Sequence, residues 1–143
     1  MHQLEVTSPD ESATKQIAQT VAKRLKGGEL IELIGDVGSG KTTFVKGLAR
    51  GLGSQDEVTS PSFVLQNVYD GRLRLHHFDL YRLEEPGHII HDIEEAIKSD
   101  DSVSVIEWAA AGKEMLPDKR IIIKFLPQND SSRKIKISFP DAR

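Results

Sequence analysis

The sequence lacks cysteine altogether, so disulfide bridges and thiolate metal sites are excluded. It also lacks any apolar run that approaches the roughly 18 residues needed to span a bilayer. Its N-terminal residues do not show the basic and then apolar pattern of a signal peptide. Together these absences predict a soluble protein of a reducing compartment, and we expect a cytoplasmic location.

An excess of basic residues is also missing. The chain has 19 Lys and Arg against 22 Asp and Glu, which gives a net charge of −3. A protein that grips nucleic acid by itself needs a basic face, so the charge balance argues against that class. The length of 143 residues suits one hydrophobic core. We therefore expect residues 1–143 to form a single domain.

Three segments carry apolar residues at helical spacing. The first follows a cluster of helix-starting residues at 8–12, and we expect its helix to end at Gly27. The second runs from about Lys41 to a stop at Gly53. The third, over residues 87–98, is more weakly amphipathic.

Short apolar runs between these helices predict strands. Asp70 and Gly71 separate two of the runs and form a strong hairpin turn signal. The expected strands cover residues 4–7, 30–34, 63–69, 73–78, 103–106, 121–125 and 135–139.

The segment of residues 35–42, GDVGSGKT, fits the phosphate-binding pattern G-x-x-x-x-G-K-[ST]. Its glycines allow successive backbone N–H groups to point inward at phosphates, and the helix that follows directs its positive dipole end at the same place. Lys41 is expected to reach the β- and γ-phosphates, and the Thr42 hydroxyl to bind Mg²⁺. A glycine-rich turn without a ligand is the alternative, but the apolar strand before the segment and the amphipathic helix after it favour nucleotide binding. The residues expected to bind the nucleotide here are Gly38, Ser39, Gly40, Lys41, Thr42 and Thr43.

Two acidic residues follow apolar strands and are candidate carboxylates for the metal. Glu107 ends the run at residues 103–106, and Asp79 ends the run at residues 73–78. Ser60 and Ser62 lie in a hydroxyl-rich loop after the second helix, where a switch loop would sense the γ-phosphate. The alternative for this loop is a plain turn.

These motifs together resemble the bacterial TsaE family, the ATPase of tRNA threonylcarbamoyladenosine biosynthesis. The resembling segments are residues 35–44, 60–63, the HFDLYRL segment at 77–83, and 106–108. They stand in the family's order and spacing, and the resemblance covers about residues 8–126. The HFDLYRL segment is specific, whereas the phosphate-binding loop alone is not.

The resemblance implies an α/β fold, the three-layer P-loop NTPase fold with a mixed β-sheet flanked by helices. It implies ATP and Mg²⁺ as ligands and two partner proteins, TsaB and TsaD. In the family, TsaD transfers the threonylcarbamoyl group to adenosine 37 of tRNA. ATP binding and hydrolysis by the TsaE protein are thought to reset that complex between turnovers, so tRNA is met through the partners.

Roles for single residues also follow from the resemblance. Glu107 corresponds to an acid that helps to hold Mg²⁺, and Asp79 to an acid needed for activity. Thr14 corresponds to a threonine near the nucleotide, and Trp108 to a tryptophan that lines the nucleotide site. The chain departs from the family in having Ser62 where the loop usually carries threonine, and in the divergent segment 84–102.

Two other functions use the same loop. A small-molecule kinase is the main alternative, but it needs a substrate pocket and an arginine-bearing lid, and no arginine-rich segment is present. A GTP-dependent switch needs an Asn-Lys-x-Asp segment, which is absent. Intrinsic hydrolysis by an ATPase of this sequence is expected to be slow.

A few other polar residues have two interpretations each. His88 and His91 lie three residues apart on an expected helix, where an exposed face is favoured over a metal site. His76 and His77 are expected to pack at a strand end. For Arg82, an ion pair with a nearby carboxylate is favoured over contact with phosphate.

Overall fold

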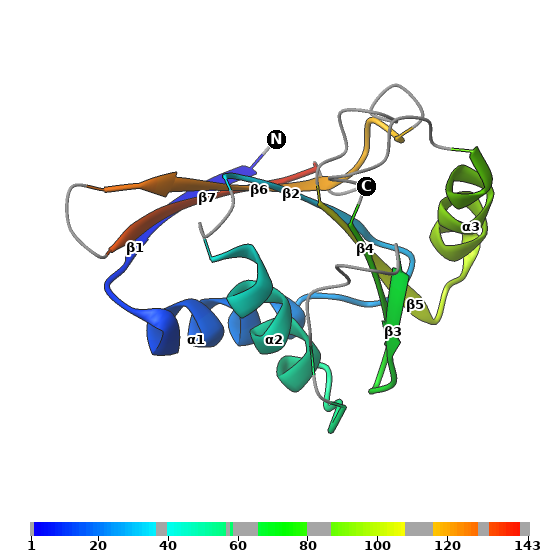
Figure 1. Cartoon of the computed structure of the whole chain (residues 1–143), viewed down its shortest axis with the longest axis horizontal. Coiled ribbons are helices and arrows are strands. Elements are labelled where there is room, and N and C mark those ends of the chain that lie inside the picture. Colours follow the sequence, from blue (N-terminus) through cyan, green and yellow to red (C-terminus); the bar gives the residue numbers. More distant parts are fainter. Residues whose placement is uncertain are drawn as a thin grey trace.

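The computed structural model describes residues 2–36, 40–56, 58, 66–79, 87–107, 116–128 and 132–140. Within these residues seven strands form one sheet, in the order β1-β7-β6-β2-β5-β4-β3 (Figure 1). The strands are β1 (His2–Ser8), β2 (Leu30–Ile34), β3 (Gln66–Tyr69), β4 (Arg74–Asp79), β5 (Ser102–Glu107), β6 (Ile121–Pro127) and β7 (Arg133–Phe139). Helices α1 (Glu11–Ala22) and α2 (Lys41–Gly51) cover one face of this curved sheet, and α3 (Gly87–Lys98) lies on the other face.

The middle of the sheet is parallel and its flanks are antiparallel. Strand β2 pairs in parallel with both β5 and β6, and β4 pairs in parallel with β5. The pairs β1–β7, β6–β7 and β3–β4 are antiparallel. Every residue of β5 is buried, because a central strand of an α/β sheet has a layer on each face. The carboxyl ends of β2, β4 and β5 therefore meet at one edge, where α/β proteins bind ligands.

Asp10 caps the start of helix α1, and its carboxylate accepts a hydrogen bond from the first turn. The helix was expected to continue to Gly27, but it ends at Ala22. The carbonyl groups of Ala22 and Leu25 instead accept hydrogen bonds from the Arg72 guanidinium, at 3.0 and 3.1 Å. This long-range partner satisfies carbonyl groups that a longer helix would have paired internally. The apolar period continues past the helix end because Leu25 is still a core residue.

Helices α1 and α2 pack closely through small residues. A Cβ atom on Gly47 would lie 2.6 Å from that of Ala18, and one on Gly51 would lie 2.6 Å from that of Ala22. Glycine is therefore required at both positions for this approach. The pairing also means that the two helices run in the same direction, so their first turns lie at the same end of the layer.

The two faces of the sheet carry cores of different size. The larger core lies between the sheet and helices α1 and α2, and Phe44 and Leu48 are completely buried in it. Full burial of one such side chain is worth about 1.5–3 kcal/mol. The smaller core lies beneath α3 and consists of Leu30, Phe78, Ile93, Ala96, Ile106 and Leu116.

The structure confirms the predicted α/β class and the mixed sheet between helices. Each predicted strand has a counterpart, although the ends differ by up to two residues and only residues 66–69 of the strand expected at 63–69 are described. The predicted helix at 87–98 matches α3. Among the helices that the structure describes, none combines the length and the apolar character needed to cross a membrane.

Candidate functional site

The segment of residues 35–42, which matches the phosphate-binding pattern, joins the end of β2 to the start of α2. Of its residues, the structure describes Gly35, Asp36 and the last three, Gly40, Lys41 and Thr42. Gly40 is the residue before the helix and has a φ of 105°, in the left-handed region where a side chain is strained. As a glycine it supplies no capping side chain to the first turn of α2. The first N–H groups of α2 therefore have no capping side chain from Gly40 as a hydrogen-bond partner.

Lys41 folds back over this segment. Its ammonium group donates a hydrogen bond to the Gly35 carbonyl oxygen at 2.5 Å. The same nitrogen lies 4.0 Å from Oε1 of Glu107, and the lysine side chain is only 5% exposed. The lysine thus lies between the loop and the carboxyl end of β5, as expected for a side chain that contacts phosphate.

Burial and nearby carboxylates act in opposite directions on the pKa of Lys41. Burial lowers the pKa of Lys41 from its ordinary value, and the carboxylates of Glu107, Asp79 and Asp36 act in the opposite direction. Because burial outweighs these carboxylates, the ammonium group would gain from an additional anion nearby. A phosphate group would supply that charge.

Asp79 and Glu107 are neighbours at the ends of adjacent strands. They face each other in the parallel register of β4 and β5, and Glu107 is also opposite Leu33 of β2. Leu33 belongs to the core beneath α1 and α2, so both carboxylates face the layer that carries Lys41. Glu107 is buried and Asp79 is half-buried.

These residues offer oxygen atoms of the kind that bind Mg²⁺. Carboxylates and hydroxyls are hard donors, and Mg²⁺ is commonly held by one or two carboxylates together with substrate phosphates. Thr42 and Thr43 are half-buried in the first turn of α2. Among the described residues, no three His, Cys, Asp or Glu side chains gather closely enough to hold a metal by themselves. The donor set thus fits a magnesium ion that arrives with a nucleotide.

His77 lies in the site, although the sequence did not predict it there. We expected His76 and His77 to pack at a strand end, but both lie within β4 and point to opposite faces. Nε2 of His77 forms a hydrogen bond with Oε2 of Glu107, and the histidine is completely buried. The alternation of Leu75, His77 and Asp79 along one strand face was the signal that could have revealed this position.

Thr14, expected near the nucleotide, lies in the first turn of α1 and is 4% exposed. Its hydroxyl group is 2.7 Å from that of Ser8, and it donates to the Asp10 carbonyl oxygen at 3.2 Å. The first turns of α1 and α2 lie at the same end of their layer. Thr14 therefore lies at the same end of this layer as the start of α2, with its hydroxyl group engaged in bonds within the chain.

Several predicted site residues cannot be placed. Gly38, Ser39, Ser60, Ser62 and Trp108 lie outside the described residues, as does Arg82. Their roles remain predictions.

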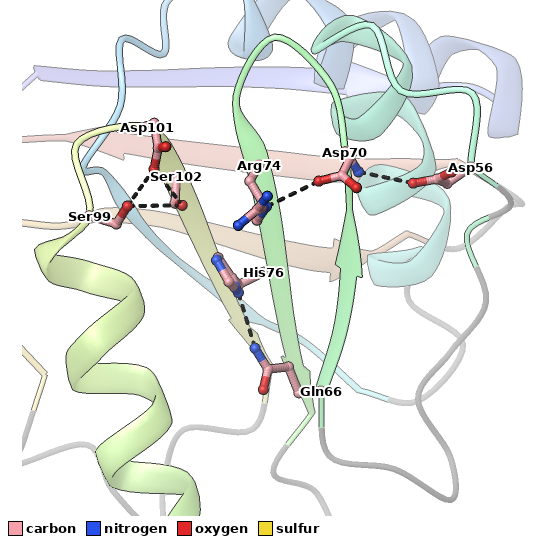
Figure 2. A network of polar contacts seen from close by, with 8 residues as sticks. All are labelled: Asp56, Gln66, Asp70, Arg74, His76, Ser99, Asp101 and Ser102. Atoms are coloured by element: carbon pink, nitrogen blue, oxygen red, sulfur yellow. Dashed lines mark hydrogen bonds and ion pairs between the residues drawn. The ribbon is translucent and has the colours of Figure 1, made fainter.

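A second group of polar side chains lies on the opposite face of the sheet, beside α3 (Figure 2). There Nδ1 of His76 is 3.0 Å from the side-chain nitrogen of Gln66, and Arg74 forms an ion pair with Asp70. Burial and the nearby Arg74 lower the pKa of His76, whereas Asp101 and Asp70 oppose this shift. A groove on this face of the sheet is lined by Gln66, Arg74, His76, Asp92, Glu95, Ala96, Ser99 and Ser102.

Comparisons with known proteins agree on one family. Residues 8–135 match the family model described as threonylcarbamoyl adenosine biosynthesis protein TsaE. The tRNA threonylcarbamoyladenosine biosynthesis protein TsaE of Bacillus subtilis is 38% identical, over 94% of this chain and 85% of its own. The protein of the same name from Treponema pallidum is 38% identical, over 87% of this chain and 93% of its own.

A solved structure gives the same answer for the fold. The crystal structure of Bacillus subtilis YdiB superposes with a TM-score of 0.77 at 34% identity, covering 98% of this chain and 87% of that one. The predicted P-loop fold is thus confirmed. With a family model that spans most of its length and relatives that match nearly all of it, the chain belongs to the TsaE family.

Proposed function

We propose that this protein binds ATP with Mg²⁺ at the edge formed by β2, β4, β5 and the start of α2, and that it hydrolyses the nucleotide slowly on its own. The observation that carries the proposal is the position of Lys41. Its buried ammonium group lies between the Gly35 carbonyl and the Glu107 carboxylate, with its pKa lowered by burial. A triphosphate would replace the carbonyl as the partner of this charge.

The described residues at this edge of the sheet have different parts in binding ATP and Mg²⁺. Lys41 binds the β- and γ-phosphates, and the first N–H groups of α2 face the same anion. Thr42 and Glu107 would hold Mg²⁺, which when bound neutralises charge on the phosphate oxygens. The nucleotide-binding roles of Thr14, Gly38, Ser39, Gly40, Thr43 and Trp108 belong to the same proposal.

Hydrolysis requires a water molecule placed behind the γ-phosphate. Its oxygen forms a bond to phosphorus while the bond to the bridging oxygen breaks. ADP leaves with the electron pair, the phosphate keeps the new oxygen, and the proton that the water loses passes to the product phosphate or to solvent. We assign the orientation of this water to Asp79, which is half-buried, whereas Glu107 is buried and has Oε2 bonded to His77. Ser60 and Ser62 form the switch loop in this proposal.

The biological setting follows from the family. The relatives carry the name tRNA threonylcarbamoyladenosine biosynthesis protein, and we propose that this chain serves the same modification. Its partners would be TsaB and TsaD, with nucleotide hydrolysis here resetting their complex between turnovers. Contact with tRNA would be made through those partners, and residues 1–143 would act as one P-loop domain.

The test is a reconstitution with purified TsaB and TsaD. We expect modified adenosine to accumulate over many turnovers with the wild-type chain, and to stop after about one turnover with Asp79→Asn. Equal multiple-turnover yields with and without the chain would contradict the accessory role. Binding of a fluorescent ATP analogue to each variant separates loss of hydrolysis from loss of binding.

A further inference from the structure

His77 is a completely buried side chain that the proposed mechanism has not yet used. It lies on the face of β4 that packs against the layer of α1 and α2, where its neighbour Leu75 and the adjacent Val105 are apolar core residues. A histidine at this position buries polar nitrogen atoms, which costs free energy that an aliphatic side chain would not. The hydrogen bond to Glu107 offsets this cost.

The bond divides the two oxygens of one carboxylate. Oε2 of Glu107 is bonded to Nε2 of His77, while Oε1 faces the Lys41 ammonium group at 4.0 Å. A distance of 4.0 Å leaves room between the acid and the lysine, because a hydrogen-bonded pair of this kind would be close to 2.8 Å. The structure thus keeps Oε1 near Lys41 without joining the two groups directly.

The bond also fixes which ring nitrogen carries hydrogen. An ionised carboxylate only accepts, so Nε2 has to donate. Within the part of the chain that the structure describes, Nδ1 of His77 is buried without a hydrogen-bond partner. A hydrogen on Nδ1 alone would bury an unpaired donor and place two acceptors against each other. The surroundings therefore select the tautomer with hydrogen on Nε2.

We propose that His77 is a positioning residue, which holds the Glu107 carboxylate so that Oε1 is kept for Mg²⁺ rather than drawn onto Lys41. This inference rests on the proposed function, since it takes Glu107 as a ligand of the nucleotide-bound metal. Without His77, the buried carboxylate would turn to the nearest strong donor, the Lys41 ammonium group. The resulting tight pair would occupy the two groups that are needed for phosphate and for Mg²⁺.

The experiment compares substitutions that differ in donor position. Glutamine at position 77 places its amide nitrogen about where Nε2 stands, whereas leucine keeps bulk and removes the donor. His76→Leu is the matched control, because His76 is the next residue of β4 and faces the α3 layer. The measurement is the affinity for a fluorescent ATP analogue as a function of Mg²⁺ concentration, with EDTA as the metal-free reference.

We expect His77→Leu to raise the Mg²⁺ concentration needed for half-maximal enhancement by about 10–100-fold, the usual effect of losing a group that orients a metal ligand. His77→Gln should stay within about threefold of wild type, and His76→Leu should match wild type. An unchanged Mg²⁺ requirement in His77→Leu, or equal losses in His77→Gln and His77→Leu, would overturn the inference. Absence of nucleotide binding by the wild-type protein would instead overturn the proposed function itself.

Two further measurements separate positioning from folding. In a Glu107→Gln background, His77→Leu should cause no additional change in the Mg²⁺ requirement if it acts through Glu107, and an additive change would contradict that route. If the leucine variant does not fold, nitrogen NMR of the wild-type imidazole decides the matter. Hydrogen on Nε2 of His77 supports the inference, and a bare Nε2 overturns it.

Discussion

Two ion pairs with buried carboxylates lie on opposite faces of the same sheet, and they are built differently. Arg120 donates from Nε to Oε1 of Glu32 at 2.9 Å, beneath the α3 face, and also bonds the Pro117 carbonyl. Lys41 and Glu107, on the face of α1 and α2, are 4.0 Å apart, and each has another partner.

We interpret the first pair as one that serves the fold, and the second, following the proposed function, as one that serves a ligand. In the first pair, Arg120 and Glu32 satisfy each other's charge within the chain. In the second, a backbone carbonyl group holds the lysine and a histidine holds the acid, and in the proposed function an anion and a cation would enter between them. A short distance between buried charges is thus no measure of functional importance.

The largest expected effect is a loss of ATP affinity when the pair of Lys41 and Glu107 is changed. Lys41→Met keeps most of the side-chain bulk but removes the charge. A unit charge at 4 Å is worth about 4 kcal/mol at an effective dielectric near 20, so affinity for ATP should fall by up to roughly a thousandfold. Calorimetric titration measures this, with Arg120→Met as the matched control that should bind as wild type. Equal losses in both variants would erase the comparison.

The next largest effect is a loss of stability when the pair of Arg120 and Glu32 is changed. Arg120→Met leaves the Glu32 carboxylate, only 4% exposed, without its cation. The free energy of unfolding should fall by about 3 kcal/mol, because an uncompensated buried charge is costly. Urea denaturation measures the loss, and the double variant Glu32→Leu with Arg120→Met should recover most of it. A single variant as stable as wild type would show that the pair does not serve the fold.

A smaller effect concerns two glycines, one before α2, which carries Lys41, and one before β2, which carries Glu32. Gly40 precedes α2 and Gly28 precedes β2, with φ values of 105° and 86°, and an added Cβ at either site would meet no atom of the described residues within 4 Å. Replacement by alanine should therefore cost each protein only the backbone strain, about 1–2 kcal/mol. Thermal unfolding should show similar losses, while only Gly40→Ala should weaken ATP binding. Weakened binding in Gly28→Ala would assign the effect to general destabilisation.

The smallest effect is a pH dependence on the α3 face. Burial, followed by Arg74, lowers the pKa of His76 below its ordinary 6.5, against the opposing Asp101 and Asp70. The unfolded chain then binds a proton more readily, so this residue's contribution to stability is present above pH 6.5 and is lost as the pH falls through the lowered pKa. His76→Gln should make unfolding less sensitive to acid between pH 7 and pH 5 in urea titrations. Identical pH profiles for the two proteins would contradict this.

How much could be predicted from the sequence depended on how far apart the interacting residues are. The end of β2 at Ile34, the start of α2 at Lys41 and the position of Glu107 at the end of a strand follow from local patterns and were predicted correctly. The bond between His77 and Glu107 spans 30 residues, the Arg72 contact that ends α1 spans 50, and the Arg120–Glu32 pair spans 88. Such pairings are set by strand order, which spacing along the chain does not reveal. His76 and His77 looked alike in the sequence because their difference is the face to which each points.

The most direct test of the account is a crystal structure with Mg²⁺ and a non-hydrolysable ATP analogue. We predict that the Lys41 ammonium group leaves the Gly35 carbonyl oxygen and lies about 3 Å from a phosphate oxygen, within hydrogen-bonding distance. Glu107 should keep its bond to His77. A nucleotide bound elsewhere, with Lys41 still bonded to Gly35, would contradict the account.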